Sequence, residues 1–376
     1  MRVLGFGTYD LATHPRPGVM LDGLRSYGDE VVELNEPLGF STAERVAMLG
    51  KPWLAYRLVL RLLARWASLI RGSVRLRRSA HYDVVIVGYL GHFDVALARL
   101  LYPRSRIVLD LMIFAVDTAR DRGTSSGLKL RLLGALDTFA TRCSDVVALD
   151  TDEQLSLLAE SARHKAVVVP VGASAEWFAA AGQRGPESPQ SLRVVFFGVY
   201  TPLQGAAVIG QALARLAHRA DIEVTMIGTG QDYPATRAAA HANPHVTWLD
   251  WLDSDELART VAEHNVCLGI FGDSAKAQRV VPNKVYQGAA AGCAILTSDT
   301  APQRRMLGSA AVYVPAGDPV ALADALISLA DDRARTAALQ TAARSMAMDR
   351  FTAETVVAPL RARLSGAAPE PGAKHG

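Results

Sequence analysis

Short runs of β-branched and aliphatic residues alternate with longer helical stretches along the chain. In the first half these runs fall at residues 3–6, 31–34, 84–87, 107–109 and 146–149. Continuous apolar strands joined by helices are typical of a parallel sheet that is covered on both faces. The first half is therefore predicted to be an α/β domain with a doubly wound sheet.

The same pattern starts a second time after residues 182–191, which are rich in Gly, Pro, Ser and Gln, as linkers are. Further strand-like runs occupy residues 193–198, 223–227, 266–270, 294–297 and 311–314. The sequence thus predicts two Rossmann-like domains, 1–181 and 192–365, joined by a linker at 182–191. The last helix can pack back on the first domain, and residues 366–376 are expected to form a disordered tail. Parallel sheets bind ligands at the carboxyl ends of their strands, so the site is expected in a cleft between the domains.

Composition excludes several classes of protein. The 40 Lys and Arg residues nearly balance 37 Asp and Glu residues, which does not favour a nucleic-acid partner. The three cysteines, Cys143, Cys267 and Cys293, lack metal-ligand spacing and indicate a reduced, cytoplasmic protein. Neither an export signal nor a membrane-spanning run is recognised. This also weakens the alternative of a periplasmic binding protein.

Glycine turns and basic side chains are the candidate anion ligands. Glycines follow predicted strands at Gly7, Gly198 and Gly228, although tight turns alone can explain them. More specific is the segment 269–299, in which Lys276, Arg279 and Lys284 cluster near a helix that opens after Pro282. A helix start already favours an anion, so this cluster predicts a diphosphate site. A plain solvated loop is the alternative.

At this point the chain resembles glycosyltransferase family 4, whose members have the two-domain GT-B fold and retain anomeric configuration. The similarity lies in Pro282-Asn283-Lys284-Val285-Tyr286-Gln287-Gly288, which looks like the donor-binding helix, and in Phe197-Gly198-Val199-Tyr200-Thr201-Pro202-Leu203-Gln204-Gly205, which looks like the phosphate loop. It implies that the donor diphosphate is bound by Gly198, Val199, Gln204, Gly205, Lys276, Arg279 and Lys284. It further implies that Gly228 and Gln287 contact the nucleotide and its ribose.

The chain departs from the family at four positions. Many members have Arg and Lys where this chain has Val199 and Gln204, and the two family glutamates align with Arg279 and Gln287. A branch with a P-L-Q/H-G loop and an R-V-I-P-N-K-x-x-Q helix shares these changes. In that branch the basic residues of segment 269–299 are expected to replace the missing diphosphate contacts, and an amide at 287 can still hydrogen-bond the ribose.

In the first half, Gly91-His92-Phe93-Asp94 resembles the loop bearing the family's active-site histidine. His92 and Asp94 are therefore predicted to be catalytic, with a structural helix entry as the alternative. The residues expected to line the cleft are Gly7, Thr8, Arg16 and Asp117. No D-x-D motif stands in a convincing metal-binding context, so neither a cofactor nor a metal is expected.

One segment has a strong charge bias. Residues 45–78 contain nine basic residues and no acidic one. Arg57, Arg61 and Arg65 recur at helical spacing, and an apolar surface is expected from Trp53, Leu54, Leu58, Leu62, Trp66 and Leu69. This pattern predicts either an interfacial helix on an anionic membrane or a core-packed helix with one solvated basic stripe.

These observations predict a retaining, metal-independent glycosyltransferase that uses a nucleotide-diphosphate sugar. It would be cytoplasmic, with peripheral attachment to the inner face of the membrane as an option. The acceptor is left open among a polysaccharide, a lipid-linked glycan and a secondary metabolite. The alternatives are a catalytically weak donor-binding partner protein and a sugar-nucleotide epimerase or hydrolase of the same fold.

Overall fold

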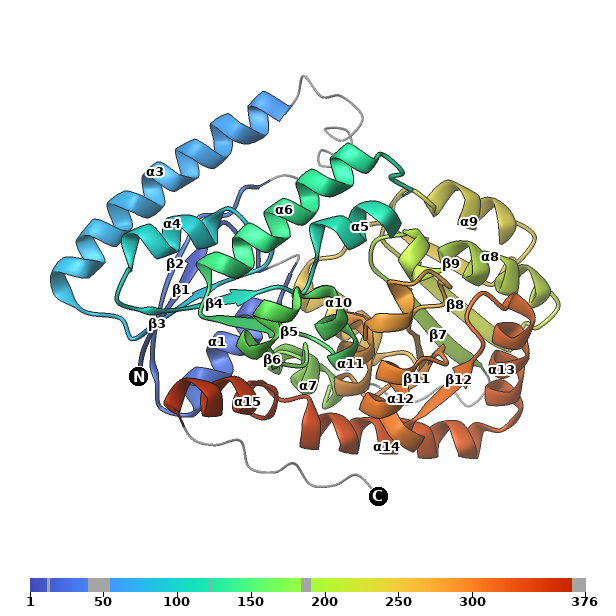
Figure 1. Ribbon diagram of the computed structural model, residues 1–376. Helices are drawn as coiled ribbons and strands as arrows, with labels where there is room; N and C mark the ends of the chain where they lie inside the picture. The colour runs from blue at the N-terminus through green and yellow to red at the C-terminus, as the bar shows by residue number, and fades with distance from the viewer. Residues whose placement is uncertain (12–13, 40–54, 122, 184–190, 367–376) are drawn as a thin grey trace. The chain divides into compact units, whose positions relative to one another are not determined.

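The computed structural model describes residues 1–11, 14–39, 55–121, 123–183 and 191–366. The chain divides into two compact units. Unit 1 comprises residues 1–170 together with 353–376, and unit 2 comprises residues 171–352. Both are α/β, and Figure 1 shows helices on the two faces of each sheet. The predicted pair of doubly wound domains is confirmed.

Unit 1 is built on a six-stranded parallel sheet in the order β2-β1-β3-β4-β5-β6. Its strands are β1 (Arg2–Gly7), β2 (Glu30–Asn35), β3 (Val84–Val87), β4 (Arg106–Asp110), β5 (Val146–Leu149) and β6 (Ala166–Val168). The chain reverses its winding direction between β1 and β3, so the crevice at their carboxyl ends is the topological switch point of this sheet. The loops after these two strands hold Thr8 and His92.

Two apolar layers cover the sheet of unit 1. One face packs on α3 (Ala55–Ser79), α4 (Asp94–Leu101) and α6 (Gly127–Cys143), through a core that includes Leu69, Val95 and Ala140. The other face packs on α1 (Arg16–Ser26) and α15 (Ala353–Ser365). Helices α1 and α15 approach closely at Gly23, where an added Cβ would lie 2.1 Å from the Ala353 carbonyl oxygen. The shorter helices of the unit are α5 (Ala115–Asp121), η2 (Asp152–Leu157) and η3 (Glu160–Lys165).

Unit 2 contains a second six-stranded parallel sheet, in the order β12-β11-β10-β7-β8-β9. Its strands are β7 (Leu192–Phe197), β8 (Ile222–Ile227), β9 (Val246–Leu249), β10 (Val266–Leu268), β11 (Ala294–Ser298) and β12 (Ala311–Val314). The winding reverses between β7 and β10, which sets the switch point of this sheet. Strand β9 had not been predicted because it is a short edge strand that is only partly buried.

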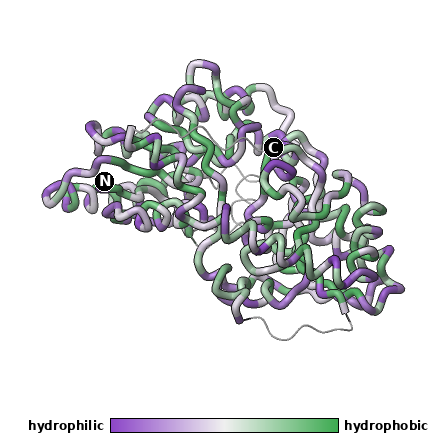
Figure 2. The backbone as a smooth tube through the Cα atoms, turned by 90° about the horizontal axis from the view of Figure 1, so that it is seen from below, coloured by the Kyte–Doolittle hydropathy of each residue, from purple (hydrophilic) through white to green (hydrophobic). Residues whose placement is uncertain are grey.

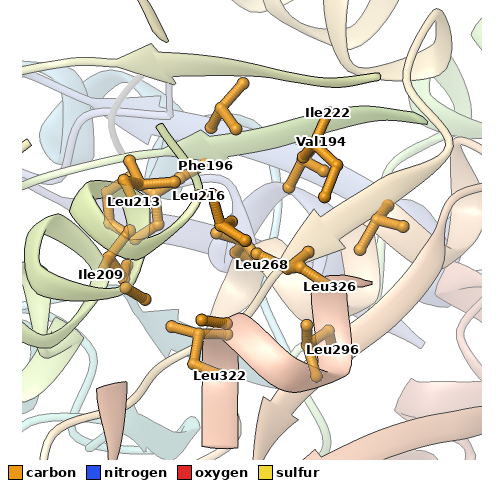
Figure 3. Packing of buried hydrophobic residues seen from close by; sticks show 14 of the residues in the cluster. Val194, Phe196, Ile209, Leu213, Leu216, Ile222, Leu268, Leu296, Leu322 and Leu326 are labelled. Atoms are coloured by element: carbon orange, nitrogen blue, oxygen red, sulfur yellow. The ribbon is translucent and has the colours of Figure 1, made fainter. Parts of the chain in front are cut away.

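Helices lie on both faces of the second sheet (Figure 1). The helices and helical turns of unit 2 are α7 (Ala175–Ala181), η4 (Pro202–Gln204), α8 (Ala206–Arg215), α9 (Tyr233–Ala239), α10 (Ser254–Ala262), η5 (Ala277–Arg279), α11 (Asn283–Ala290), α12 (Ala301–Leu307), η6 (Gly308–Ala310), α13 (Pro319–Asp331) and α14 (Arg333–Arg350). Alternate strand residues such as Val194 and Phe196 pack against Leu213 of α8 and Leu326 of α13 (Figure 3). Along the helices, hydrophobic and hydrophilic positions alternate (Figure 2), as amphipathic helices require.

The boundary between the units differs in position from the predicted linker at 182–191. Helix α7 packs with α10 and α11, so residues 171–181 belong to unit 2 rather than to the first domain. Residues 184–190 lie outside the described part of the chain, as do most residues of the predicted tail. The chain returns to unit 1 after Thr352, where α15 packs on α1.

Candidate functional site

The loop after β7 lies at the switch point of unit 2 and has a conformation that requires glycine. Gly198 has φ 126° and Gly205 has φ 66°, both in the region that L side chains rarely adopt. A Cβ on Gly205 would lie 2.4 Å from the carbonyl carbon of Phe271, in the loop after β10. The two loops are joined by a hydrogen bond from the Phe271 amide to the Gln204 carbonyl oxygen, 3.0 Å long. The loop is thus held against the neighbouring strand end, with α8 starting directly after it.

Gly228 supports this loop from the end of β8. It has φ 107°, and an added Cβ would lie 2.3 Å from the Gly198 carbonyl oxygen. The amide of Gly198 in turn donates to the Ile227 carbonyl oxygen over 3.1 Å. The need for glycine at 228 is therefore explained by close backbone packing. The predicted nucleotide contact at this position stays a prediction.

Lys284 brings a charge to the same place from the first turn of α11. Its Nζ donates to Gln204 Oε1 over 2.6 Å and lies 3.6 Å from the centre of the Phe196 ring. The residue is only 4% exposed, and this burial lowers the pKa of the Lys284 ammonium to about 7. Within the described part of the chain, the hydrogen-bond partner of this ammonium is the neutral Gln204 amide rather than a carboxylate, and such a buried ammonium is costly to keep charged. An anion at the glycine loop would supply the missing counter-charge.

The other predicted basic residues lie in the loop that precedes α11. Lys276 and Arg279 stand at the two ends of η5 and are partly exposed. This turn is docked by Ala277 and Val280, which pack in a small apolar cluster with Leu203 of η4. The structure thereby places the basic loop beside the glycine loop. Val199 and Gln287 are both partly buried, and Gln287 follows Lys284 on α11.

In unit 1, Asp94 links three elements at the switch point. Its Oδ2 accepts from the Thr8 amide over 2.8 Å and from Thr8 Oγ1 over 2.7 Å, and its Oδ1 accepts from Trp66 Nε1 over 2.7 Å. Burial raises the pKa of Asp94, and the bonds from Trp66 and Thr8 oppose that rise. Gly7 lies under this carboxylate, since an added Cβ would be 3.2 Å from Oδ2. These contacts fix the position of the Thr8 loop.

His92 has a carboxylate partner that sequence reasoning missed. His92 Nε2 lies 2.9 Å from Asp137 Oδ1, and both residues are buried. The Asp137 carboxylate also accepts from the amides of Ala115, over 2.9 Å, and Val116, over 3.2 Å, at the start of α5. If Nε2 donates to Asp137, Nδ1 is left as an acceptor in the neutral ring. The sequence held one hint of this partner, because Asp137 is the single acidic residue of α6.

The approach to His92 has an unusual backbone. Leu90 has φ 60°, and such left-handed conformations cost a non-glycine residue about 1 to 3 kcal/mol. Strain of this kind persists only where the surrounding structure fixes it. The turn before His92 is closed by a hydrogen bond from the Gly91 amide to the Gly88 carbonyl oxygen, 3.0 Å long.

Two further residues were predicted to line the cleft, Arg16 and Asp117, and they lie in different environments. Arg16 is 1% exposed, and its Nε donates to Asp110 Oδ1 over 2.8 Å. Burial raises the pKa of Asp110, and the Arg16 charge opposes this. Arg16 therefore lies in the interior as one half of a buried ion pair. Asp117 is a partly buried residue of α5, the helix whose first amides bind Asp137.

Among the residues that the structure describes, no group of three or more His, Cys, Asp or Glu side chains is arranged to hold a metal ion. No helix in this part of the chain combines the length and the apolar character needed to cross a membrane.

Residues 191–332 match the family model described as "Glycosyl transferases group 1". Unit 2 contains a glycosyl transferases group 1 domain. The matched range includes the glycine loop and Lys284. A curated relative, a phosphatidyl-myo-inositol mannosyltransferase of Mycobacterium leprae, is 28% identical over 169 residues, which are 44% of this chain and 44% of that protein.

Solved structures show that this group 1 domain belongs to a two-domain fold. The Anabaena protein HepE, in complex with UDP and glucose, matches with a TM-score of 0.68 at 13% identity, covering 97% of this chain and 100% of that one. Sucrose-phosphate synthase from Thermosynechococcus elongatus matches with a TM-score of 0.70 at 13% identity, covering 97% and 99%. The chain thus has the domain and the GT-B fold of glycosyltransferases.

Proposed function

We propose that this chain is a glycosyltransferase that moves a sugar from a nucleotide-diphosphate sugar to a hydroxyl group of an acceptor. The observation that carries the proposal is the position of Lys284, a buried ammonium at the glycine loop of a group 1 domain. The leaving diphosphate is the anion that matches this charge. HepE was crystallised with UDP and with UDP-glucose, which makes uridine nucleotides the first donors to test.

The proposed donor site stabilises the negative charge that develops on the leaving diphosphate. Backbone amides at the start of α8, directly after the Gly198–Gly205 loop, supply partial positive charge without reorganisation. Lys284, which a bound diphosphate would keep protonated, adds a buried positive charge, and Lys276 and Arg279 add theirs from the two ends of η5. Gln287 and Gly228 are proposed to contact the ribose and the nucleotide.

In unit 1, His92 is proposed to act at the transferred sugar, with Asp137 as the residue that positions it. The 2.9 Å contact fixes the orientation of the ring and allows Asp137 to balance positive charge on it. Asp94 was predicted to be catalytic as well. Its three hydrogen bonds to Thr8 and Trp66 favour a positioning role for the Thr8 loop.

We also propose membership of glycosyltransferase family 4, with retention of anomeric configuration and no metal requirement. In that reaction the bond between the anomeric carbon and the leaving phosphate oxygen breaks, and the acceptor oxygen bonds to the same face. The acceptor's proton passes to the departing phosphate. Proton NMR of the first-formed product would show whether the donor's anomeric configuration is kept.

The proposed acceptor offers a hydroxyl group. A polysaccharide, a lipid-linked glycan and a secondary metabolite are all chemically suitable. The basic segment 45–78 is proposed to meet an anionic surface at the inner face of the membrane, which would favour a lipid-linked acceptor. Residues 45–54, including Trp53 and Leu54, lie outside the described part of the chain.

Incubation with a panel of radiolabelled nucleotide sugars tests the proposed activity. A glycosyltransferase releases nucleoside diphosphate and forms product only when a suitable acceptor, such as a cell-membrane extract, is added. Acceptor-independent breakdown would indicate a hydrolase, and interconversion of the sugar would indicate an epimerase. Tight binding without turnover would favour the donor-binding partner protein.

A further inference from the structure

Exposed apolar side chains of the described residues are concentrated in one layer of unit 1. Fifteen large apolar side chains are exposed, and ten of them lie on the three helices that cover a single face of the sheet. Six are on α3, one is on α4 and three are on α6. They are Tyr56, Val59, Leu60, Leu63, Ile70, Val74, Leu100, Leu128, Leu132 and Phe139.

These residues form stripes along the helices. On α6, Leu128, Leu132 and Phe139 are four and seven positions apart, which places them on one side of the helix. The opposite side of α6 carries the buried residues Asp137 and Ala140, so the stripe faces away from the core. On α3, residues 56, 60, 63, 70 and 74 follow the same spacing.

The stripe on α3 is not the one that the sequence predicted. Trp66 and Leu69 had been expected to form the apolar surface, but Leu69 is fully buried in the core. Trp66 packs against the same core and donates to Asp94. The core takes one face of α3, so the helix packs on the sheet as the second predicted alternative states, and it also exposes a separate apolar stripe.

Positive charge flanks the stripes, and exposed negative charge is missing from the two long helices. On α3 the exposed basic residues are Arg57, Arg61, Arg71, Arg75, Arg77 and Arg78, and the helix contains no acid. On α6 they are Lys129, Arg131 and Arg142, and the lone acid, Asp137, is buried. Figure 1 shows α3, α4 and α6 together on one side of unit 1.

We infer that the outer surface of α3, α4 and α6 docks on an anionic lipid bilayer. Lipid chains accept the aliphatic side chains, and anionic headgroups match the surrounding guanidinium groups. A second copy of this chain is a poor occupant, because a two-fold contact would place these cations against one another. Nucleic acid fits less well, since single strands bind through aromatic stacking and the exposed residues are mostly aliphatic.

This inference does not depend on the proposed transfer reaction, and it extends beyond the charged segment to α4 and α6. It predicts two separable contributions to bilayer binding. Arginines on α3 provide a salt-sensitive attraction to anionic headgroups, and leucines on α6 insert among the lipid chains. Because α6 also holds Asp137, membrane contact would be made by the same helix that positions His92.

Cosedimentation with phosphatidylcholine vesicles containing phosphatidylglycerol tests the inference. The three proteins to compare with wild type are Leu128→Gln/Leu132→Gln, Arg57→Glu/Arg61→Glu/Arg75→Glu, and the control Met348→Gln. Met348 is an exposed apolar residue of α14 in unit 2. Thermal melting of each variant first confirms that it is folded.

Wild type should bind anionic vesicles at low salt and be released at high salt. The arginine variant should lose about a hundredfold in partitioning, at roughly 1 kcal/mol per basic residue. The leucine variant should bind clearly less well at the same salt, and the control should bind like wild type. Absence of wild-type binding at low salt, or equal binding by all four proteins, would overturn the inference. So would sedimentation velocity showing that wild type is a dimer and the leucine variant a monomer.

Discussion

The Lys284 ammonium lies between a neutral amide and an aromatic ring: its Nζ is 2.6 Å from Gln204 Oε1 and 3.6 Å from the Phe196 ring centre. Neither group carries a formal negative charge. Burial therefore dominates, and it lowers the pKa of Lys284 to about 7. The proposed donor site of the free protein thus holds an amine that a bound diphosphate would keep protonated.

This arrangement predicts that Lys284 contributes a pH-dependent part of the stability. Its pKa is lower in the folded protein than in the unfolded chain, where it is about 10.4. The unfolded chain then binds more protons between pH 7 and 10, so the free energy of unfolding should rise with pH in that window. The increase approaches about 1.4 kcal/mol per pH unit.

Denaturant unfolding of wild type and Lys284→Met at pH 7, 8 and 9 isolates this contribution. Other groups also titrate in that range, so the difference between the two proteins is the informative quantity. The stability of wild type relative to Lys284→Met should increase with pH. A difference that stays constant from pH 7 to 9 would contradict a lowered pKa.

Diphosphate binding should be coupled to proton uptake. An anion beside Lys284 favours its charged form, so a proton is taken up when a nucleoside diphosphate binds at pH 8. Calorimetric titrations in buffers with different ionisation enthalpies would measure the number of protons. The uptake should vanish in Lys284→Met, and uptake that persists in this variant would assign the proton to another group.

The three basic residues of the donor segment should contribute unequally. Loss of a charge-assisted contact costs about 1.5 to 3 kcal/mol, roughly ten- to a hundredfold in affinity. Lys284→Ala should show the larger effect, because its charge is buried, and Lys276→Ala and Arg279→Ala smaller ones, because both residues are partly exposed. Arg335→Ala, an exposed arginine of α14, is a suitable control. Unchanged donor affinity in all three variants would exclude this segment from the diphosphate site.

Gly228→Ala should damage the glycine loop. The new Cβ would lie 2.3 Å from the Gly198 carbonyl oxygen, at a φ of 107°. We expect a loss of unfolding free energy of more than 1 kcal/mol together with weaker donor binding. Gly28→Ala is the matched control, since Gly28 has φ 79° but nothing within 4 Å of an added Cβ. Equal effects of the two changes on stability would show that the close packing at Gly228 is unimportant.

His92 and Asp137 should act together on turnover. Removing a group that stabilises charge in the transition state costs about a hundredfold or more in kcat, and we expect this for His92→Ala. Asp137→Asn keeps the carbonyl oxygen that can cap α5 but weakens the hold on His92, so kcat should fall by an intermediate amount. Nucleoside-diphosphate affinity should be unchanged in both variants. If their main effect is a lower melting temperature at normal kcat, His92 and Asp137 are structural.

Much of the fold could be predicted because it depends on local sequence patterns. Runs such as Val84–Val87 and Val146–Leu149 are continuous apolar segments, and a parallel sheet buries them on both faces. The edge strand Val246–Leu249 lacks that signal because it is only partly buried. The unit boundary was harder to predict, since it depends on the packing of α7 rather than on linker composition.

The site was predictable only in part. The sequence marks Lys284 and the glycine loop, and the structure brings them together. Contacts between residues that are distant in sequence could not be predicted: Asp94 with Trp66, and His92 with Asp137. Arg16 illustrates the same difficulty, because its buried pairing with Asp110 joins residues 94 positions apart.

Direct binding of a nucleoside diphosphate tests whether unit 2 holds a nucleotide-diphosphate donor. Calorimetric titration at pH 7 should compare UDP, other nucleoside diphosphates and the matching monophosphates, with wild type and Lys284→Met. At least one diphosphate should bind wild type, its monophosphate should bind more weakly, and Lys284→Met should lose roughly ten- to a hundredfold in diphosphate affinity. If no diphosphate binds, or if diphosphate and monophosphate bind equally well to both proteins, the donor site proposed at Gly198, Gln204 and Lys284 is contradicted.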